Sequence, residues 1–225
     1  MKLQFLGTGA ADWTKKDIEN PEYRRNAAAL VDDVLLIDPG PCVPEAMETF
    51  GLNENNVKYI LNTHCHGDHF NEETLAWFKA KGAQFVPLAA GETAQVGPYT
   101  VQALAGNHAT CPGTVHFIIS DGEKRLFYGL DGAWLLYEEY QALKNGPVDF
   151  AVLDATVGHK SGDFRIFEHN DLRMVAEMQA TLAPYVGRLC ISHMARTLHT
   201  GHAELAADME KLGIETAFDG LVVEF

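Results

Sequence analysis

The chain has 225 residues, 47% of them apolar, and its 31 acidic and 17 basic residues give a formal charge of −14. This length and apolar content allow a sizeable buried core and predict one domain over residues 1–225. The acidic excess argues against non-specific binding to nucleic acid or to an anionic membrane. The four cysteines form no CxxC pair, and no signal peptide or membrane-spanning run is recognised, so we expect a cytoplasmic protein.

Short apolar runs predict strands along the whole chain, at residues 2–6, 27–31, 34–38, 57–62, 84–88, 99–103, 114–120, 124–128, 148–153, 188–192 and 221–225. Helical patterns fall between them, at about 43–50, 72–81, 133–144, 170–182 and 202–212. Asp32-Asp33 and Asp121-Gly122 separate paired runs, where tight turns would join antiparallel strands. This order predicts an α/β protein with two sheets packed face to face and helices on the outside.

One segment concentrates side chains that can bind metal ions. His64 and His66 follow a strand-like run, and Asp68 and His69 come next across Gly67. Residues two apart in an extended segment point to the same side, so the imidazoles of His64 and His66 should face one way. Three imidazoles and a carboxylate this close together suit zinc, manganese or iron better than calcium.

Three more candidates stand at the ends of strand-like runs or just before them. They are His108 in Gly-Asn-His, Asp131 in Tyr-Gly-Leu-Asp-Gly, and His193 in Cys-Ile-Ser-His. Functional sites are often built from polar residues at such positions, because a rigid scaffold fixes them there. Taken alone, each would more readily have a structural role.

Together these residues resemble the signature of the metallo-beta-lactamase superfamily, HxHxDH followed by a distant His, Asp and His. The similarity runs from Phe5-Leu6-Gly7-Thr8-Gly9 through Leu36-Ile37-Asp38-Pro39-Gly40 to the last strand. The resemblance implies a four-layer αββα sandwich and two divalent metal ions, zinc or manganese, with iron as a further option. It also implies a ligand set in which one ion is held by His64, His66 and His108, and the other by Asp68, His69 and His193, with Asp131 bridging.

The C-terminal third resembles the phosphodiesterase branch of this superfamily, which includes phosphoribosyl cyclic phosphate phosphodiesterases and ribonuclease Z enzymes. The resemblance rests on Glu168-His169-Asn170-Asp171-Leu172, Ile191-Ser192-His193 and Ala217-Phe218-Asp219-Gly220. It implies that His169 is a catalytic residue that binds no metal. Residues 9–26 contain no cysteine for an additional structural zinc site, and no Gly/Lys-rich arm for tRNA lies between Asp131 and Asp154.

We therefore predict a phosphodiesterase that acts on a small or cyclic phosphate ester through a metal-bridging hydroxide. His169 is the candidate general acid, with a backbone cap at a helix start as the alternative role, and Asp68 is a candidate catalytic residue as well as a ligand. A lactone or thioester hydrolase, a ribonuclease Z-like nuclease and a metal-binding scaffold without catalysis are the alternative functions. A small phosphate ester is the expected partner; nucleic acid and membranes are not expected, and the sequence leaves a homodimer open.

Other polar residues could support this site. Asp38 and Asp154 follow apolar strands and could accept hydrogen bonds from ligand imidazoles, with a turn or cap role as the alternative. Cys65 lies inside the metal motif, but its side chain should face away from the ions.

Several basic residues could contact an anionic substrate, although exposed loop positions are the simpler interpretation. Arg196 and His199 follow His193 and could reach a substrate phosphate. A lid could be formed by the basic residues of the first loop, Lys15, Lys16, Arg24 and Arg25. His116 and His159 have no assigned role.

Overall fold

Two β-sheets form the centre of the computed structural model, which describes all 225 residues. The first sheet has six strands, in the order β13 (Val222–Glu224), β1 (Lys2–Gly7), β2 (Ala28–Val31), β3 (Leu35–Ile37), β4 (Tyr59–Leu61) and β5 (Gln84–Phe85). The second has seven, in the order β12 (Ile214–Thr216), β11 (Val186–Ser192), β10 (Val148–Asp154), β9 (Arg125–Gly129), β8 (Val115–Ser120), β7 (Tyr99–Ala105) and β6 (Thr93–Val96).

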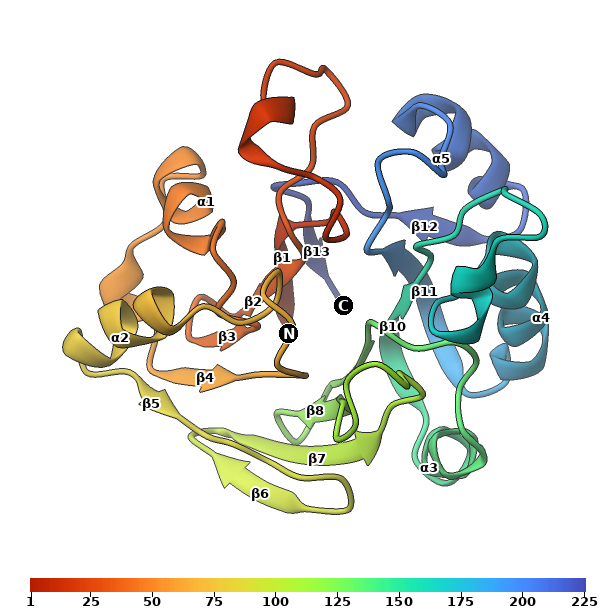
Figure 1. Cartoon of the computed structure of the whole chain (residues 1–225). Helices are drawn as coiled ribbons and strands as arrows, with labels where there is room; N and C mark the ends of the chain where they lie inside the picture. The colour runs from red at the N-terminus through yellow and green to blue at the C-terminus, as the bar shows by residue number, and fades with distance from the viewer.

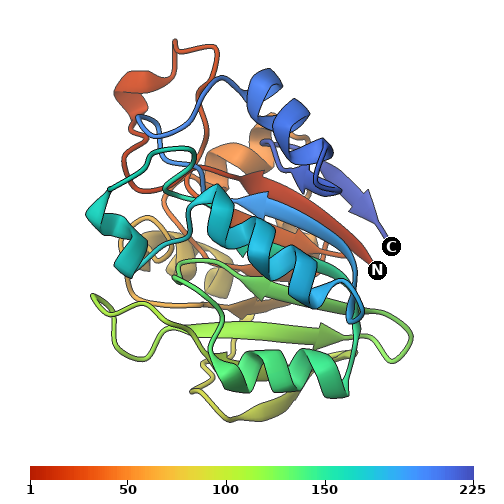
Figure 2. The same ribbon diagram turned by 90° about the vertical axis from the view of Figure 1, so that its right-hand side faces the viewer.

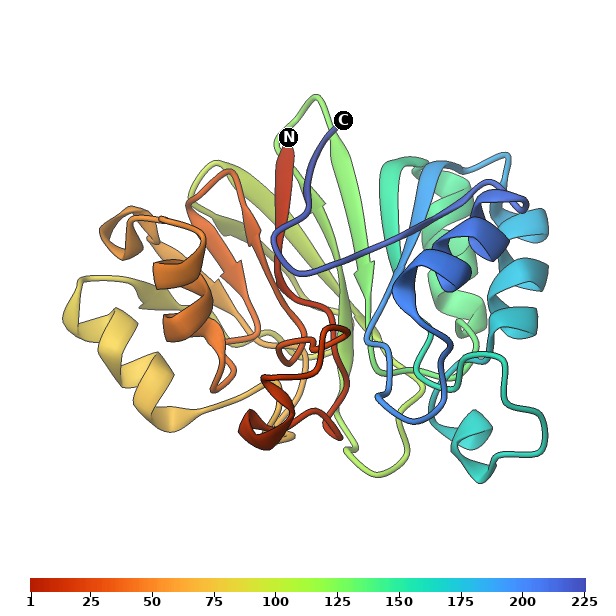
Figure 3. The ribbon, with the colours of Figure 1, turned by 90° about the horizontal axis from the view of Figure 1, so that it is seen from above.

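Helices cover the outer face of each sheet. On one side lie α1 (Val43–Thr49) and α2 (Glu72–Ala80), and on the other α3 (Tyr137–Asn145), α4 (Leu172–Leu182) and α5 (His202–Glu210) (Figures 1 and 3). Seen from the side of the second sheet, α3, α4 and α5 lie in front of the strands (Figure 2). The predicted α/β class and the four-layer αββα arrangement are confirmed.

Three apolar clusters join these layers. A cluster of 23 buried residues fills the space between the sheets and includes Phe5 of β1 together with Phe117 and Phe150 of the second sheet. A second cluster packs the helical stripe of α4, including Val175 and Met178, against the outer face of the second sheet. A third does the same for α1 and α2 on the first sheet. Burial on both sides explains why most strands read as continuous apolar runs.

Both predicted tight turns are present. Strands β2 and β3 pair antiparallel around Asp32 and Asp33, whose φ angles of 48° and 61° are left-handed. Aspartate tolerates this region because its short polar side chain can bond locally, and the turn matches the twist of the strands. Strands β8 and β9 pair in the same way around Gly122, which has a φ of 96°.

The structure adds two strands that the apolar pattern missed and shortens one helix. Strand β6 lies at a sheet edge and is mostly exposed, and β12 is only three residues long, so neither shows a continuous apolar run. The helix expected from residue 133 begins at Tyr137. Trp134 has a φ of 55°, which ends helical geometry there, and the Glu139 carboxylate caps α3 by accepting the Leu136 N–H at 2.6 Å.

The two ends of the chain lie side by side (Figure 2), since β1 pairs with β13 and Lys2 faces Glu224. None of the five helices combines the length and the apolar character that crossing a bilayer requires.

Candidate metal centre

The candidate ligands converge because the strands that carry them end at the same place. Strands β9, β10 and β11 are parallel neighbours, so Asp131, Asp154 and His193 come together at their carboxyl ends. The loop after β4 adds the His64 segment, and the loop after β7 adds His108. Carboxyl ends of parallel strands are common places for ligand sites in α/β proteins.

The backbone is strained at three residues in and around the candidate metal centre. Asp38, Asp131 and His193 have φ angles of 63°, 56° and 63°, in the left-handed region that non-glycine residues rarely adopt. Such conformations cost of order 1–3 kcal/mol each and persist where the surrounding structure holds a side chain in a required direction.

Seven side chains form two overlapping groups whose ligand atoms lie within 4.8 Å of one another. The first group consists of His64, His66, His108 and Asp131, and the second of Asp68, His69, Asp131 and His193. The structure therefore brings together all seven residues of the predicted ligand set, with Asp131 common to both groups. Cys65 belongs to neither group, as its predicted orientation requires.

The polar contacts inside the groups fit cations better than they fit hydrogen bonds alone. The Nε2 atoms of His69 and His193 are 3.1 Å apart, and His108 Nε2 is 3.1 Å from His66 Nδ1. His64 Nε2 and Asp131 Oδ1 are buried and make no hydrogen bond of suitable geometry, although His64 Nε2 is 3.2 Å from Asp131 Oδ2 and Asp131 Oδ1 is 3.0 Å from His193 Nε2. Buried unpaired groups of this kind need an explanation, and a bound ion supplies one. Imidazole and carboxylate donors are also the ligands that zinc, manganese and iron accept.

The electrostatics of the site favour positive charge between these residues. Burial alone would raise the pKa of Asp131, but His193 and His69 outweigh it and hold that pKa well below its usual range. Burial lowers the pKa of His108 to about 4. For His69 and His193, burial is outweighed by Asp131 and other carboxylates, and their pKa values lie well above the usual range. Cation binding would displace protons from these two imidazoles.

Two buried carboxylates, Asp38 and Asp154, form hydrogen bonds behind the imidazoles, which is one of the two roles that the sequence left open for them. Asp38 Oδ2 is 2.8 Å from His69 Nδ1, and Asp38 Oδ1 accepts the Thr63 N–H at 2.7 Å. His193 Nδ1 lies 2.7 Å from the Thr156 hydroxyl, which bonds to Asp154 at 2.8 Å. Such partners fix ring orientation and raise the basicity of metal-binding histidines.

His169 lies beside the second group. Its Nδ1 is 2.9 Å from Asp154 Oδ2, and its ring stacks on His193 with centroids 5.6 Å apart. Burial alone would lower the pKa of His169, but Asp154 outweighs it and raises that pKa. Its Nε2 has no hydrogen-bond partner in the protein. The alternative cap role is excluded, because Asp171 caps α4.

His169 and Asp154 also form a cluster of candidate ligand atoms with Asp131 and His193. The Asp154 oxygens, however, already accept hydrogen bonds from Thr156, from the Asn170 N–H and from His169. This cluster is therefore better described as hydrogen-bonded support for the second group than as a third metal site.

A cavity of about 180 Å³ opens onto both groups. Its 14 lining residues are Ala10, Ala11, Asp12, His66, Asp68, His108, Thr110, Asp131, Thr156, Arg165, Glu168, His169, His193 and Ala195. No role was predicted from the sequence for Arg165, Glu168 or Thr110, although Glu168 precedes His169, Thr110 lies two residues after His108, and the Thr110 hydroxyl donates to Glu168 at 2.6 Å. Closeness in sequence to His108 and His169 was the signal that could have found them.

The basic residues considered as possible substrate contacts do not line the site cavity. Arg196 and His199 line a separate cavity of about 140 Å³, and the Arg196 guanidinium bonds to the Asp12 carbonyl. Arg24 is buried against Thr8, and Arg25 pairs with Glu45 at 2.8 Å. Lys15 and Lys16, in a short 3-10 helix, do not line the site cavity. The first loop contributes Ala10, Ala11 and Asp12 to the cavity lining but none of its basic residues.

The two unassigned histidines have structural surroundings. His116 is buried, with Nδ1 2.5 Å from Glu139 and Nε2 3.0 Å from the Leu130 carbonyl. This pair ties β8 to α3 and holds the residue that precedes Asp131. His159 lies 3.7 Å from Asp208 at the surface.

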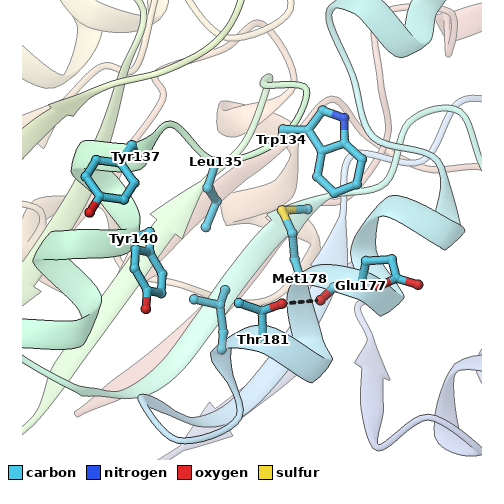
Figure 4. Close-up of a pocket in the computed structure, with 8 residues that line it drawn as sticks. Trp134, Leu135, Tyr137, Tyr140, Glu177, Met178 and Thr181 are labelled. Atoms are coloured by element: carbon cyan, nitrogen blue, oxygen red, sulfur yellow. Dashed lines mark hydrogen bonds between the residues drawn. The ribbon is translucent and has the colours of Figure 1, made fainter.

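A larger cavity of about 490 Å³ lies between α3 and α4 (Figure 4). Trp134, Tyr137, Tyr140 and Met178 line it, and Thr181 bonds to the Glu177 carbonyl at 2.9 Å within it. It contains no histidine and one carboxylate, so the candidate metal ligands and His169 lie outside it.

Comparison with known proteins agrees with this geometry. The model of the metallo-beta-lactamase superfamily matches residues 25–71, which include His64, His66, Asp68 and His69. The solved structure of Zn²⁺-bound PqqB from Methylobacterium extorquens superposes with a TM-score of 0.77 at 17% identity, covering 100% of both chains. The chain has the metallo-beta-lactamase fold.

Two further proteins share this fold or part of the sequence. A diphosphatase of the PhnP family superposes with a TM-score of 0.76 at 18% identity, covering 100% of this chain and 97% of that one. The Anti-Pycsar protein Apyc1 of Paenibacillus sp. (strain J14) is 38% identical over 91 residues. The match covers 39% of this chain and 34% of Apyc1, so the chain spans about a third of the length of that relative.

Proposed function

We propose that the protein is a hydrolase of small phosphodiesters that uses two divalent metal ions. The observation that carries this proposal is the position of His169, whose unpaired Nε2 shares a cavity with both groups of candidate ligands. A proton donor of this kind suits an alkoxide leaving group, which departs poorly without a proton. The similarity to a diphosphatase of the same fold supports phosphate chemistry.

The residues of the site divide this work. The two ions, held by the groups that share Asp131, would lower the pKa of a water molecule and stabilise charge on the phosphoryl oxygens. Asp68 faces the cavity and lies 3.5 Å from His193 Nε2, where it can hold an ion and orient the attacking group. Asp154 fixes Nδ1 of His169, leaving Nε2 to deliver the proton.

The position of Arg165 is further support for an anionic substrate, because this residue lines the cavity. Arg165 is the only lysine or arginine among the cavity residues. Asp163 holds its Nε and one terminal nitrogen at 2.8 Å each, so the guanidinium is fixed in direction while its other terminal nitrogen makes no hydrogen bond to the protein. A guanidinium held this way can bind a phosphate oxygen by a charge-assisted hydrogen bond.

Replacing Arg165 by alanine should raise KM for a small phosphodiester by about 10-fold or more, because a charge-assisted hydrogen bond contributes roughly 1.5–3 kcal/mol. Arg173→Ala is the matched control: Arg173 pairs with Asp171 two residues away in the same manner but does not line the cavity. Steady-state kinetics on both variants measure the difference. Equal KM values for the two variants would remove Arg165 from the substrate site.

The size and charge of the cavity favour a small substrate over the alternatives. Its volume of about 180 Å³ is below that of most ligand pockets, and four carboxylates line it. A polyanionic RNA would also meet a chain with a formal charge of −14. A lactone or thioester hydrolase could use the same ions but would not need the proton from His169.

A substrate panel tests the proposal directly. The purified, metal-loaded protein would be assayed on a bis-aryl phosphate, an alkyl aryl phosphodiester, a cyclic phosphate, a lactone, a thioester and a tRNA precursor. We expect turnover of the phosphodiesters, loss of it with a chelator, and recovery when zinc or manganese is restored. Preference for the lactone or thioester by kcat/KM would refute the proposal, and full metal occupancy without any turnover would favour a scaffold.

A further inference from the structure

Two cysteines meet beside the candidate metal centre and take no part in it. The Sγ atoms of Cys65 and Cys111 are 2.8 Å apart, although the residues are 46 positions apart in the sequence. Cys65 is exposed, whereas Cys111 is buried and only 5% accessible. The other two cysteines, Cys42 and Cys190, are buried elsewhere.

The two sulfur atoms belong to the two loops that carry the three histidines of the first group. Cys65 stands between His64 and His66, and Cys111 is three residues after His108. The Cys111 N–H bonds to the His108 carbonyl at 3.2 Å, which connects the cysteine to that histidine through the backbone. Any covalent link between the two sulfur atoms would therefore join these loops directly.

We propose that Cys65 and Cys111 form a reversible disulfide when the protein meets a peroxide. The sulfur atoms need to approach by only roughly 0.8 Å to reach the length of an S–S bond, a movement within the range of side-chain rotation. Because Cys65 is exposed to solvent, its sulfur is the one that reacts first with the oxidant, and Cys111, which contacts it, is the resolving thiol.

The peroxide is the only oxidant that the reaction needs. The Cys65 sulfur attacks one peroxide oxygen, the O–O bond breaks, and Cys65 becomes a sulfenic acid while one water leaves. The Cys111 sulfur then attacks the Cys65 sulfur, the S–O bond breaks, and the hydroxyl leaves as a second water with the proton of the Cys111 thiol. Two thiols and one peroxide give one disulfide and two waters; a small-molecule dithiol reverses the reaction.

The disulfide would restrict the movement of the two loops without removing any candidate metal ligand. The ligand atoms of His64, His66 and His108 cluster with Asp131 in the first group, whereas the Cys65 and Cys111 sulfur atoms contact each other and belong to neither ligand group. Joining the loops limits their local opening, which is the movement needed to release an ion. Oxidation should therefore slow metal loss and stabilise the fold, since a crosslink restricts the unfolded chain.

Thiol counting and peptide mapping test the bond itself. After hydrogen peroxide treatment of the metal-loaded protein and denaturation, we expect two free thiols in place of four, and a digest that contains a peptide linking Cys65 to Cys111. Cys42→Ser should form the same link. Cys65→Ser should lose no thiols, and Cys111→Ser should leave a Cys65 sulfenic acid that dimedone traps. Four thiols in oxidised wild type, or a sulfinic Cys65 with free Cys111, would overturn the proposal.

The expected effect of the disulfide on stability and metal retention is measured separately. The oxidised wild-type protein should melt about 5–10 °C higher than the reduced protein. It should also lose its ions to a chelator several-fold more slowly, and a dithiol should restore both values. Cys65→Ser treated with peroxide should show neither change. Faster metal loss in a protein proven to contain the Cys65–Cys111 bond would show that the crosslink distorts the site, contrary to the proposed stabilisation.

Discussion

Replacing His169 by alanine is expected to lower kcat for an alkyl phosphodiester by about 10²–10⁴-fold, the usual contribution of a general acid. The metal content should not change, because His169 Nδ1 is engaged with Asp154 and the seven candidate ligands remain. Elemental analysis and steady-state kinetics on the same preparation measure both quantities.

The identity of the leaving group separates proton donation from a merely structural role. A nitrophenolate leaves without help, so His169→Ala should impair a bis-nitrophenyl phosphate much less than an ester with an alkoxide leaving group. The matched control is His159→Ala, since His159 lies at the surface near Asp208 and outside the cavity. Equal losses on both substrates would contradict the acid role, and loss of an ion would place His169 among the ligands.

The candidate ligands that lie close together in the chain could be predicted from the sequence. The residues that only tertiary packing brings to the site could not. His64, His66, Asp68 and His69 are close in the chain, so their spacing alone indicates a metal site. His108, Asp131 and His193 came from strand-end positions together with the superfamily resemblance. Nothing local distinguishes Arg165 from Arg173, because both pair with an aspartate two residues earlier. Only the folded chain shows which of them faces the cavity.

The same limit explains why the sequence did not predict the surroundings of the basic residues or two of the strands. Arg24 and Arg25 look like an exposed basic pair, but tertiary contacts turn them to Thr8 and Glu45. Strand β6 is an exposed edge, so burial leaves little apolar pattern in its sequence. The buried strands were predictable because both of their faces are covered, which makes the apolar runs continuous.

Asp131 differs from the other candidate ligands because it is the only one that belongs to both groups. Its oxygens lie 3.2 Å from His64 Nε2, 3.4 Å from His69 Nε2 and 3.0 Å from His193 Nε2. A single carboxylate therefore faces imidazoles on both sides. Changing it should affect two ions, whereas changing His66 should affect one.

Asp131→Asn should reduce bound metal to less than one ion per chain and lower kcat/KM by more than about 100-fold. Loss of a supporting partner behind a ligand already costs 10–100-fold in affinity or activity, and a shared charged ligand should cost more. Asparagine has the size of aspartate and tolerates the left-handed φ of 56°, so the fold should persist and circular dichroism should confirm it. His66→Ala, which belongs only to the first group, should retain about one ion and provides the comparison. If Asp131→Asn keeps two ions, the carboxylate does not bridge them, and each group must hold its ion through its own remaining ligands.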